Sequence, residues 1–269
     1  MAKRKLKSNK VRILKRVIIA ILPGLIVAGY FTFANPTQKT SIVAPVENGL
    51  VGYWKLDENP AIHQTKIRDS SPFGNHGTLS TNDGEKNKSV AGKISQALSF
   101  DGVDDYVQVH LGAHPSSYSV VVWFKSTSSG GVVIDKTGQS AINTVWHESE
   151  LEVLTTGEVR ARTWNLSIIS LGTIGWDEWH FAAYTYDGSV FKGHLDGVYK
   201  AETSGAASFP SDTYFNFGAT DSTNLGNGGY FNGIIDEVRI YNRALSEEEI
   251  KEHYRGGIRR MEIKSTEIQ

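Results

Sequence analysis

The stretch that decides the fold is FNGIIDEVRIYNRALS, residues 231–246, near the end of the 269-residue chain. In an extended strand, successive side chains point to opposite faces. By this alternation Ile234, Val238 and Ile240 share one face of a predicted strand. Asp236 has the same parity, so the pattern predicts one carboxylate among three aliphatic side chains. The opposite face is predicted to carry Ile235, Glu237, Arg239 and Tyr241.

The residues after this strand predict a helix. Ser246 followed by Glu249 has the spacing of a capping box, in which each side chain bonds the other residue's backbone N–H. The acidic residues 247–249 complement the partial positive charge of a helix N-terminus. We therefore expect a helix to about Tyr254, followed by a polar tail over residues 257–269.

Upstream, from residue 48 onward, short alternating apolar runs are separated by Gly, Asp, Asn and Ser. This pattern is typical of an antiparallel all-β sandwich, and its length suits one domain over residues 48–256. The run 119–124 is apolar on both faces, which predicts a central strand covered on both sides. The predicted strands are 51–56, 97–100, 106–109, 119–124, 132–135, 150–155, 158–164, 168–171, 180–186, 190–195, 214–218 and 233–241.

The N-terminus predicts export. Residues 1–16 carry eight Lys or Arg and no acid, and residues 17–34 are eighteen uncharged, mostly apolar residues. That length is near the minimum for a transmembrane helix, and the basic flank places residues 1–16 in the cytoplasm. Two interpretations remain, an uncleaved transmembrane anchor and a signal peptide cleaved after Ala34. Under either, residues 35–47 are an extended linker, and the domain is membrane-anchored outside the cytoplasm or secreted.

Composition excludes several functions. The formal net charge of -1 is uneven, because the chain after residue 16 has 20 basic and 29 acidic residues. An acidic domain argues against binding nucleic acid, which requires a clustered basic face. The chain has no cysteine, so disulfides, thiol catalysis and cysteine-ligated zinc are excluded and the domain must be stabilised by its own core.

Four further segments, taken with residues 231–246, resemble laminin-G-like domains of the concanavalin A-like jelly-roll class, in that family's order. They are 49–57 (GLVGYWKLD), 69–79 (Asp-Ser-Ser-Pro-Phe-Gly-Asn-His-Gly-Thr-Leu), 92–107 (GKISQALSFDGVDDYV), and 179–188 (WHFAAYTYDG) with 195–197 (LDG). Ser95 departs from the pattern, since the family usually has glycine there. The resemblance implies a jelly-roll β-sandwich that binds carbohydrate or protein, in many cases with calcium, and it implies no catalysis.

Calcium takes about six to eight oxygen ligands from carboxylates and carbonyl groups. Asp69 and Asn75 lie in one loop, and Asp236 lies in the closing strand, which a jelly roll tends to place near the first strand. These three residues are the predicted metal ligands. The alternative is that they only accept backbone and hydroxyl hydrogen bonds that fix the loops. Asp221 is a second candidate, in a loop where the related pentraxins bind calcium.

Glu148, Glu150 and Glu152 share one parity and resemble the catalytic strand of laminarinase-type glucanases of this fold. A pair of carboxylates about 5 Å apart would allow a retaining glycosidase mechanism, and the hydrolase alternative uses Glu148 and Glu152. The alternative is a hairpin that pairs Glu152 with Arg160 and Glu150 with Arg162, giving two cross-strand pairs of opposite charge.

The tryptophans divide into two groups. Trp54 and Trp123 lie in runs that are apolar on both sides, which predicts core positions. Trp146, Trp164 and Trp176 lie at strand ends or beside polar residues such as Asn165, and any of them could form an aromatic platform for a sugar ring. The predicted ligand-binding residues are Trp146, Trp164, Asn165 and Asp221.

We therefore expect a non-catalytic binding module at the cell surface, with polysaccharide or a cell-surface protein as its ligand. Two alternatives remain open. One is a glycoside hydrolase that uses Glu148 and Glu152, and the other is a structural adhesion subunit with no small ligand.

Overall fold

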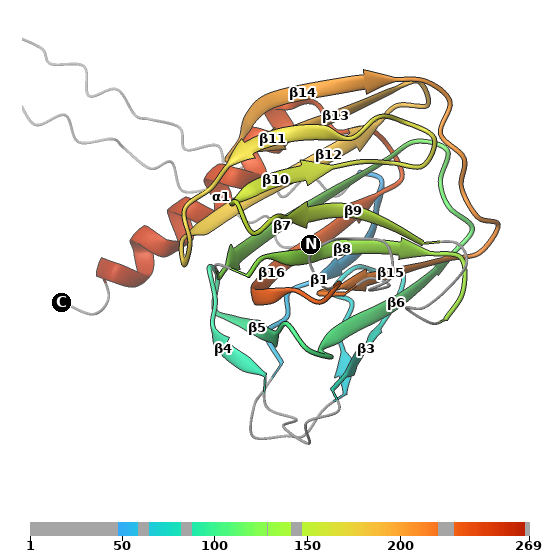
Figure 1. Ribbon diagram of the computed structural model, residues 1–269. Helices are drawn as coiled ribbons and strands as arrows, with labels where there is room; N and C mark the ends of the chain where they lie inside the picture. Colours follow the sequence, from blue (N-terminus) through green and yellow to red (C-terminus); the bar gives the residue numbers. More distant parts are fainter. Residues whose placement is uncertain are drawn as a thin grey trace, which may run out of the picture. The chain divides into compact units, whose positions relative to one another are not determined.

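The computed structural model describes residues 48–58, 65–81, 88–127, 129–140, 147–219 and 229–266 (Figure 1). The predicted cytoplasmic segment, membrane or signal segment and linker, residues 1–47, lie outside the described residues. In the part of the chain that is described, no helix is both long and apolar enough to span a bilayer.

Two antiparallel sheets form the domain, which confirms the predicted all-β sandwich. Sheet I has the order β14 (Val198–Ser204), β13 (Val190–Leu195), β12 (Trp179–Tyr186), β7 (Tyr118–Ser126), β16 (Asn232–Tyr241), β5 (Gln96–Asp101) and β4 (Ser89–Ala91), and β1 (Leu50–Trp54) also pairs with β16. Sheet II has the order β11 (Ile169–Thr173), β10 (Glu158–Ala161), β9 (His147–Val153), β8 (Gly131–Thr137), β15 (Thr213–Phe217), β6 (Tyr106–Gly112), β3 (Gly77–Ser80) and β2 (Lys66–Ile67).

The main core lies between the two sheets. Trp54 of sheet I meets Phe217 of sheet II edge to face, with ring centroids 5.3 Å apart. In β7 every side chain from Tyr118 to Phe124 is buried, because β7 lies between β12 and β16 and both of its faces are covered. This confirms the predicted central strand and the predicted core position of Trp54.

All twelve predicted strands overlap a strand of the structure. Four strands were not predicted: β2, β3, β4 and β14. Strands β2, β3 and β4 have two to four residues, too few to show a periodic pattern. Strand β14 is a mostly exposed edge strand, and an edge strand that buries little apolar surface has no alternation to detect.

A β-bulge in β16 overturns the predicted face of Asp236. Between the β7 partners of Asp236 and Arg239 the register shifts by one residue, and Glu237 lies in the left-handed region with φ 55°. Before the bulge Ile235 faces the main core, and after it Val238 does. The prediction that Asp236 and Val238 share a face is therefore wrong, because the extra residue reverses the alternation. The bulge lies where the edge partner of β16 changes from β5 to β1.

A second core lies on the outer face of sheet I under helix α1 (Glu247–Thr266). Tyr254 stacks on Trp123, with ring centroids 5.5 Å apart and an interplanar angle of 19°. The predicted capping box is confirmed, since Ser246 N–H donates to Glu249 at 2.8 Å and Glu249 N–H donates to Ser246 Oγ at 3.2 Å. The helix is longer than predicted and includes residues 257–266 of the expected polar tail.

Candidate functional site

A row of polar side chains crosses the outer face of sheet II. Because Val107 and Val109 of β6 and Phe215 and Phe217 of β15 fill the main core, the residues between them face outward. The register places the row across five neighbouring strands. Its members are Thr78, Gln108, Asn216, Asp135 and Ser149.

The members of this row are hydrogen-bonded to one another. Gln108 Nε2 donates to Asn216 Oδ1 at 2.9 Å, and Asn216 Nδ2 donates to Asp135 Oδ2 at 3.1 Å. Asn216 and Asp135 are fully buried, whereas Gln108 is half-buried and Thr78 is exposed. The accessible end of the row is therefore the part that lies on β3 and β6.

An aromatic pair lies beside this accessible end. Tyr214 of β15 stacks on His110 of β6, with ring centroids 4.3 Å apart and an interplanar angle of 18°. His110 Nε2 contacts Asp212 Oδ1 at 2.6 Å, which fixes the imidazole. A flat ring next to amide groups is the combination that sugar rings require, because C–H faces stack on rings while hydroxyls bond amides. We call Thr78, Gln108, His110 and Tyr214 the outer-face site.

The residues of the outer-face site were not among those predicted from the sequence. A signal was available, since YVQVHLG (106–112) and TYFNF (213–217) alternate apolar and polar residues with a period of two. The alternation within each segment does not show that the two segments pair with each other. Gln108 and Asn216, which are hydrogen-bonded, are 108 positions apart in the sequence.

Of the predicted ligand-binding residues, Trp146 and Asp221 lie outside the described residues. Trp164 and Asn165 form a turn after β10, in which Asn165 has φ 69° and the Trp164 side chain is 40 % exposed. Strands β9 and β8 separate β10 from β15, so this turn and the outer-face site are different places on the domain.

The predicted calcium ligand Asp69 is saturated with hydrogen-bond donors. Its carboxylate accepts the backbone N–H groups of Tyr53 (2.9 Å), Ser71 (2.8 Å) and Asn75 (2.8 Å), and Ser71 Oγ at 2.7 Å. Asn75 in turn donates its side-chain amide to Val51 O at 3.0 Å. This arrangement favours the alternative in which the two residues fasten the loop to β1.

Asp236, the third predicted ligand, is bound elsewhere. Its Oδ2 accepts the backbone N–H of Ile94 at 2.9 Å, and its side chain is fully buried. Burial raises the pKa of Asp236 to about 8, and the charges of Glu237 and Asp57 contribute in the same direction, against the Ile94 N–H. Asp69 forms an isolated β-bridge with Trp54 of β1, and β1 pairs with β16 along its other edge. Strand β1 therefore lies between Asp69 and Asp236.

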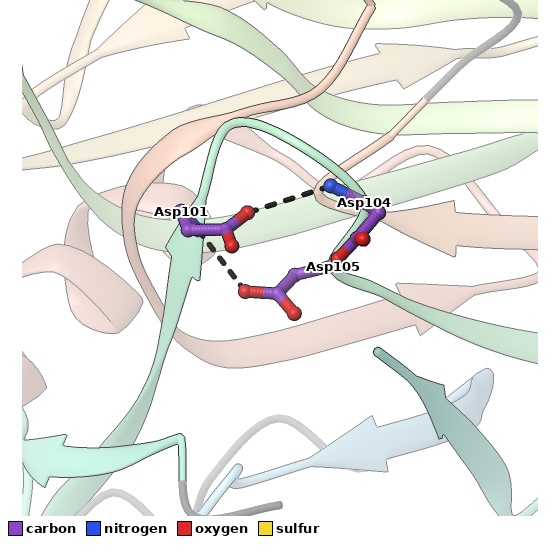
Figure 2. A group of neighbouring side chains, drawn as sticks. All are labelled: Asp101, Asp104 and Asp105. Atoms are coloured by element: carbon purple, nitrogen blue, oxygen red, sulfur yellow. Dashed lines mark hydrogen bonds between the residues drawn. The ribbon is translucent and has the colours of Figure 1, made fainter. Parts of the chain in front are cut away.

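Figure 2 shows a separate acidic group at the end of β5 and in the loop that follows, formed by Asp101, Asp104 and Asp105. Asp101 Oδ1 accepts the N–H of Asp104 at 3.4 Å, and Asp105 Oδ2 accepts the N–H of Asp101 at 3.1 Å. The ammonium of Lys88 lies 3.0 Å from Asp105 Oδ2. A lysine therefore already supplies positive charge to this loop.

The prediction that the three glutamates of β9 share a face is wrong. Ile134 pairs with Leu151 and the next residue of β8, Asp135, pairs with Ser149, so Glu150 is an extra residue in β9. Leu151 faces the main core, which directs Glu152 outward. Glu150 nevertheless also points inward, where it accepts hydrogen bonds from tyrosines of sheet I.

For the alternative, a hairpin of β9 and β10, the predicted register is confirmed. Of its two predicted charge pairs, one is confirmed and one is wrong. Arg160 pairs with Glu152, as predicted, and Arg162 N–H donates to Glu150 O at 3.1 Å. The predicted side-chain pair of Glu150 with Arg162 is wrong, because the Glu150 carboxylate lies in the core and Arg162 Nε donates to Ser149 O.

Comparison with known structures places the fold among domains that are parts of larger proteins. Domain 4 of AbnA, a GH43 extracellular arabinanase from Geobacillus stearothermophilus in complex with arabinotriose, matches with TM-score 0.51 and 21% identity over 76% of this chain and 97% of that domain. Trypanosoma rangeli sialidase in complex with sialic acid matches with TM-score 0.55 and 13% identity over 77% of this chain and 32% of the sialidase.

The receptor binding domain of botulinum neurotoxin D matches with TM-score 0.54 and 15% identity, over 79% of this chain and 54% of that structure. The chain thus spans about a third of the sialidase and about half of the toxin domain. No curated protein matches the chain. The family model for the concanavalin A-like lectin/glucanases superfamily matches residues 101–251, more than half of the chain. The chain belongs to the concanavalin A-like lectin/glucanase superfamily.

Proposed function

We propose that this domain is a non-catalytic carbohydrate-binding module that holds its ligand at the outer-face site. The observation that carries the proposal is the juxtaposition of the half-buried Gln108 amide with the stacked rings of Tyr214 and His110. The bond to Asn216 holds the Gln108 amide in one orientation, so little side-chain entropy remains to be lost when a sugar hydroxyl binds.

The fold supports a carbohydrate ligand by analogy. The similar arabinanase domain was solved with arabinotriose, and the similar sialidase with sialic acid. Neither similarity identifies the sugar that this chain binds, because sequence identities this low show a shared fold and not a shared ligand. A polysaccharide of the cell surface or its surroundings is the ligand class we propose.

A non-catalytic role agrees with the arrangement of the acidic residues. A glycosidase needs two carboxyl groups that flank one glycosidic bond. Glu148 contacts Lys136 inside the sandwich, whereas Glu152 faces outward next to Arg160. Two groups on opposite faces of one strand cannot act on the same bond, so this pair does not support the glycoside hydrolase alternative.

Export and calcium remain parts of the proposal that rest on sequence. The basic residues 1–16 and the apolar residues 17–34 support an extracytoplasmic location, membrane-anchored or secreted. For calcium, the Asp69 loop is already saturated with donors, so we assign any calcium effect to Asp236.

The test is a glycan array probed with the full chain, with and without a calcium chelator, followed by titration with arabinotriose or the best array ligand. Gln108→Ala and Tyr214→Ala should each weaken binding at least about tenfold, which corresponds to about 1.4 kcal/mol. Tyr199→Ala is the matched control, because Tyr199 is an exposed aromatic residue on the distant edge strand β14, and it should leave affinity unchanged.

Other outcomes would redirect the proposal. If Trp164→Ala abolishes binding and Tyr214→Ala does not, the ligand binds at the turn after β10 instead of the outer-face site. A chain that retains no glycan at all, yet binds a cell-surface protein, would be an adhesion module and the carbohydrate proposal would be wrong.

A further inference from the structure

A lysine lies in the middle of the sandwich core. Lys136 of β8 is fully buried, and its ammonium contacts two carboxyl groups of β9. Nζ lies 3.1 Å from Glu148 Oε2 and donates a hydrogen bond to Glu150 Oε1. The register makes Lys136 and Glu148 direct cross-strand partners, so their side chains leave the backbone side by side.

Aromatic side chains surround this trio and separate it from water. The Lys136 ammonium lies 5.1 Å from the ring centroid of Tyr118 and 4.8 Å from that of Phe209. His114 stacks on Phe209, with centroids 3.9 Å apart. Tyr118 and Tyr184 each donate a phenolic O–H to Glu150, at 2.6 and 2.8 Å.

The two glutamates have different neighbours in this enclosure. Three donors converge on the Glu150 carboxyl group, the hydroxyls of Tyr118 and Tyr184 and the ammonium of Lys136. Burial raises the pKa of Glu148, and the charge of Glu150 raises it further, against the effect of Lys136. Burial lowers the pKa of Lys136, but its two carboxyl neighbours outweigh burial and raise it. The raised pKa favours the protonated form of Glu148, which is the form whose carbonyl carbon an amine can attack.

We propose that Lys136 and Glu148 condense into an intramolecular amide, with Glu150 as the general base. The three groups have the required positions: a nucleophilic nitrogen, an acyl carbon on the neighbouring strand, and a base in contact with the nitrogen. Alignment within a dry core replaces the activation that such a condensation needs in water, because the reactants are already oriented and desolvated.

The reaction balances without any co-reactant. Glu150 accepts a proton from the Lys136 ammonium, and the neutral Nζ attacks the carbonyl carbon of the Glu148 carboxylic acid. The C–N bond forms, and Glu150 transfers a proton to the departing hydroxyl, so the C–O bond breaks and water leaves. Glu150 then takes the second nitrogen proton and ends as a neutral acid, and the Tyr118 and Tyr184 hydroxyls remain on it throughout.

Such a bond would give this domain a covalent crosslink that cysteine cannot supply, since the chain has no cysteine. It would join β8 to β9 in the centre of sheet II, so that residues 136–148 form a covalently closed loop. The inference concerns the core and is independent of the ligand that the outer face binds.

The test is the intact mass of the purified full chain, measured under denaturing conditions and followed by peptide mapping. The expected result is a mass lower by one water molecule, with a branched peptide that joins the segments containing Lys136 and Glu148 and with no tryptic cleavage after Lys136. Full mass, with separate unmodified peptides from a chain that has folded as judged by circular dichroism, would overturn the proposal.

Variants locate the chemistry. Lys136→Met removes the nucleophile, and Glu150→Gln removes the base while it keeps the shape of the side chain; both should have the full mass. Glu152→Gln is the matched control on the same strand, because that residue faces outward, and it should still lose one water. If Glu150→Gln condenses as completely as the unmodified chain, or if the branched peptide joins other residues, the assignment is wrong. If a variant does not fold, the intact mass of the unmodified chain still decides whether the amide between Lys136 and Glu148 forms.

Discussion

The backbone N–H of Ile94 donates a hydrogen bond of 2.9 Å to Oδ2 of Asp236, two residues that are 142 positions apart. The other oxygen, Oδ1, is buried and has no hydrogen-bond partner among the described residues. A charged carboxylate at this position would therefore be poorly solvated, and burial without hydrogen-bond partners costs a charged group more than a neutral carboxylic acid. Burial of this carboxyl group is therefore the main cause that raises the pKa of Asp236 to about 8, against the opposing effect of the Ile94 N–H.

We predict that Asp236 makes stability fall as the pH rises from about 4 to about 8. Its pKa is 3.8 when unperturbed and about 8 in the folded state, so between these values the folded chain holds a proton that the unfolded chain has released. The free energy of unfolding must then decrease with pH across that window. Asp236→Asn has no such proton, and by pH 9 it should exceed the unmodified chain in stability by several kcal/mol.

Thermal unfolding of both chains from pH 4 to pH 9, with and without calcium, checks this prediction. At pH 4 the two melting temperatures should lie close together, because both side chains are then neutral in the folded state. If calcium raises the melting temperature of the unmodified chain at pH 8 and Asp236→Asn abolishes that rise, then Asp236 holds a cation and the proton account is incomplete.

The Asp69 loop offers a prediction about stability alone. Asp69→Ala would remove the acceptor of three backbone N–H groups and one hydroxyl, and unpaired groups that stay partly buried are costly. We expect the free energy of unfolding to fall by about 3 kcal/mol, measured by urea denaturation. Calcium bound at this loop should not contribute to the free energy of unfolding of either the unmodified chain or Asp69→Ala. A loss below about 0.5 kcal/mol would show that water replaces the carboxylate.

The fold was predictable because period-two alternation is local. Strands such as β12 and β13 are read from adjacent residues alone. The β16 bulge was not predictable, since Glu237 adopts φ 55° and a glutamate gives no warning of a left-handed conformation. The extra residue reverses the alternation, so Val238 and Ile240 face the main core as predicted, whereas Asp236 lies on the opposite face. The bulge in β9 likewise places Glu150 and Glu152 on opposite faces.

The candidate site was less predictable than the fold, and for a different reason. Prediction from sequence favoured residue types that are conspicuous singly, such as Trp164 and Asp69. The outer-face site instead depends on which strands are neighbours: Gln108 and Asn216 are unremarkable until β6 and β15 pair. Such non-local pairing is a property of the topology, which no single segment of the chain encodes.

Two adjacent glycines of α1 provide a final prediction with an internal control. A Cβ on Gly257 would lie 2.6 Å from Cζ2 of the buried Trp123 ring, whereas a Cβ on Gly256 would meet nothing within 4 Å. Alanine has the higher helix propensity, by up to about 1 kcal/mol. Gly256→Ala should therefore stabilise the domain by about 0.5 to 1 kcal/mol, since only propensity acts there.

Gly257→Ala should instead destabilise the domain by about 1 to 3 kcal/mol, because the buried Trp123 ring contacts both Tyr254 and Lys93 and cannot move without repacking them. Urea denaturation of both variants, together with near-ultraviolet circular dichroism of the tryptophan environment, measures the difference. If both substitutions stabilise the domain equally, α1 does not rest on Trp123 in solution, and the second core would be exposed apolar surface available to a partner.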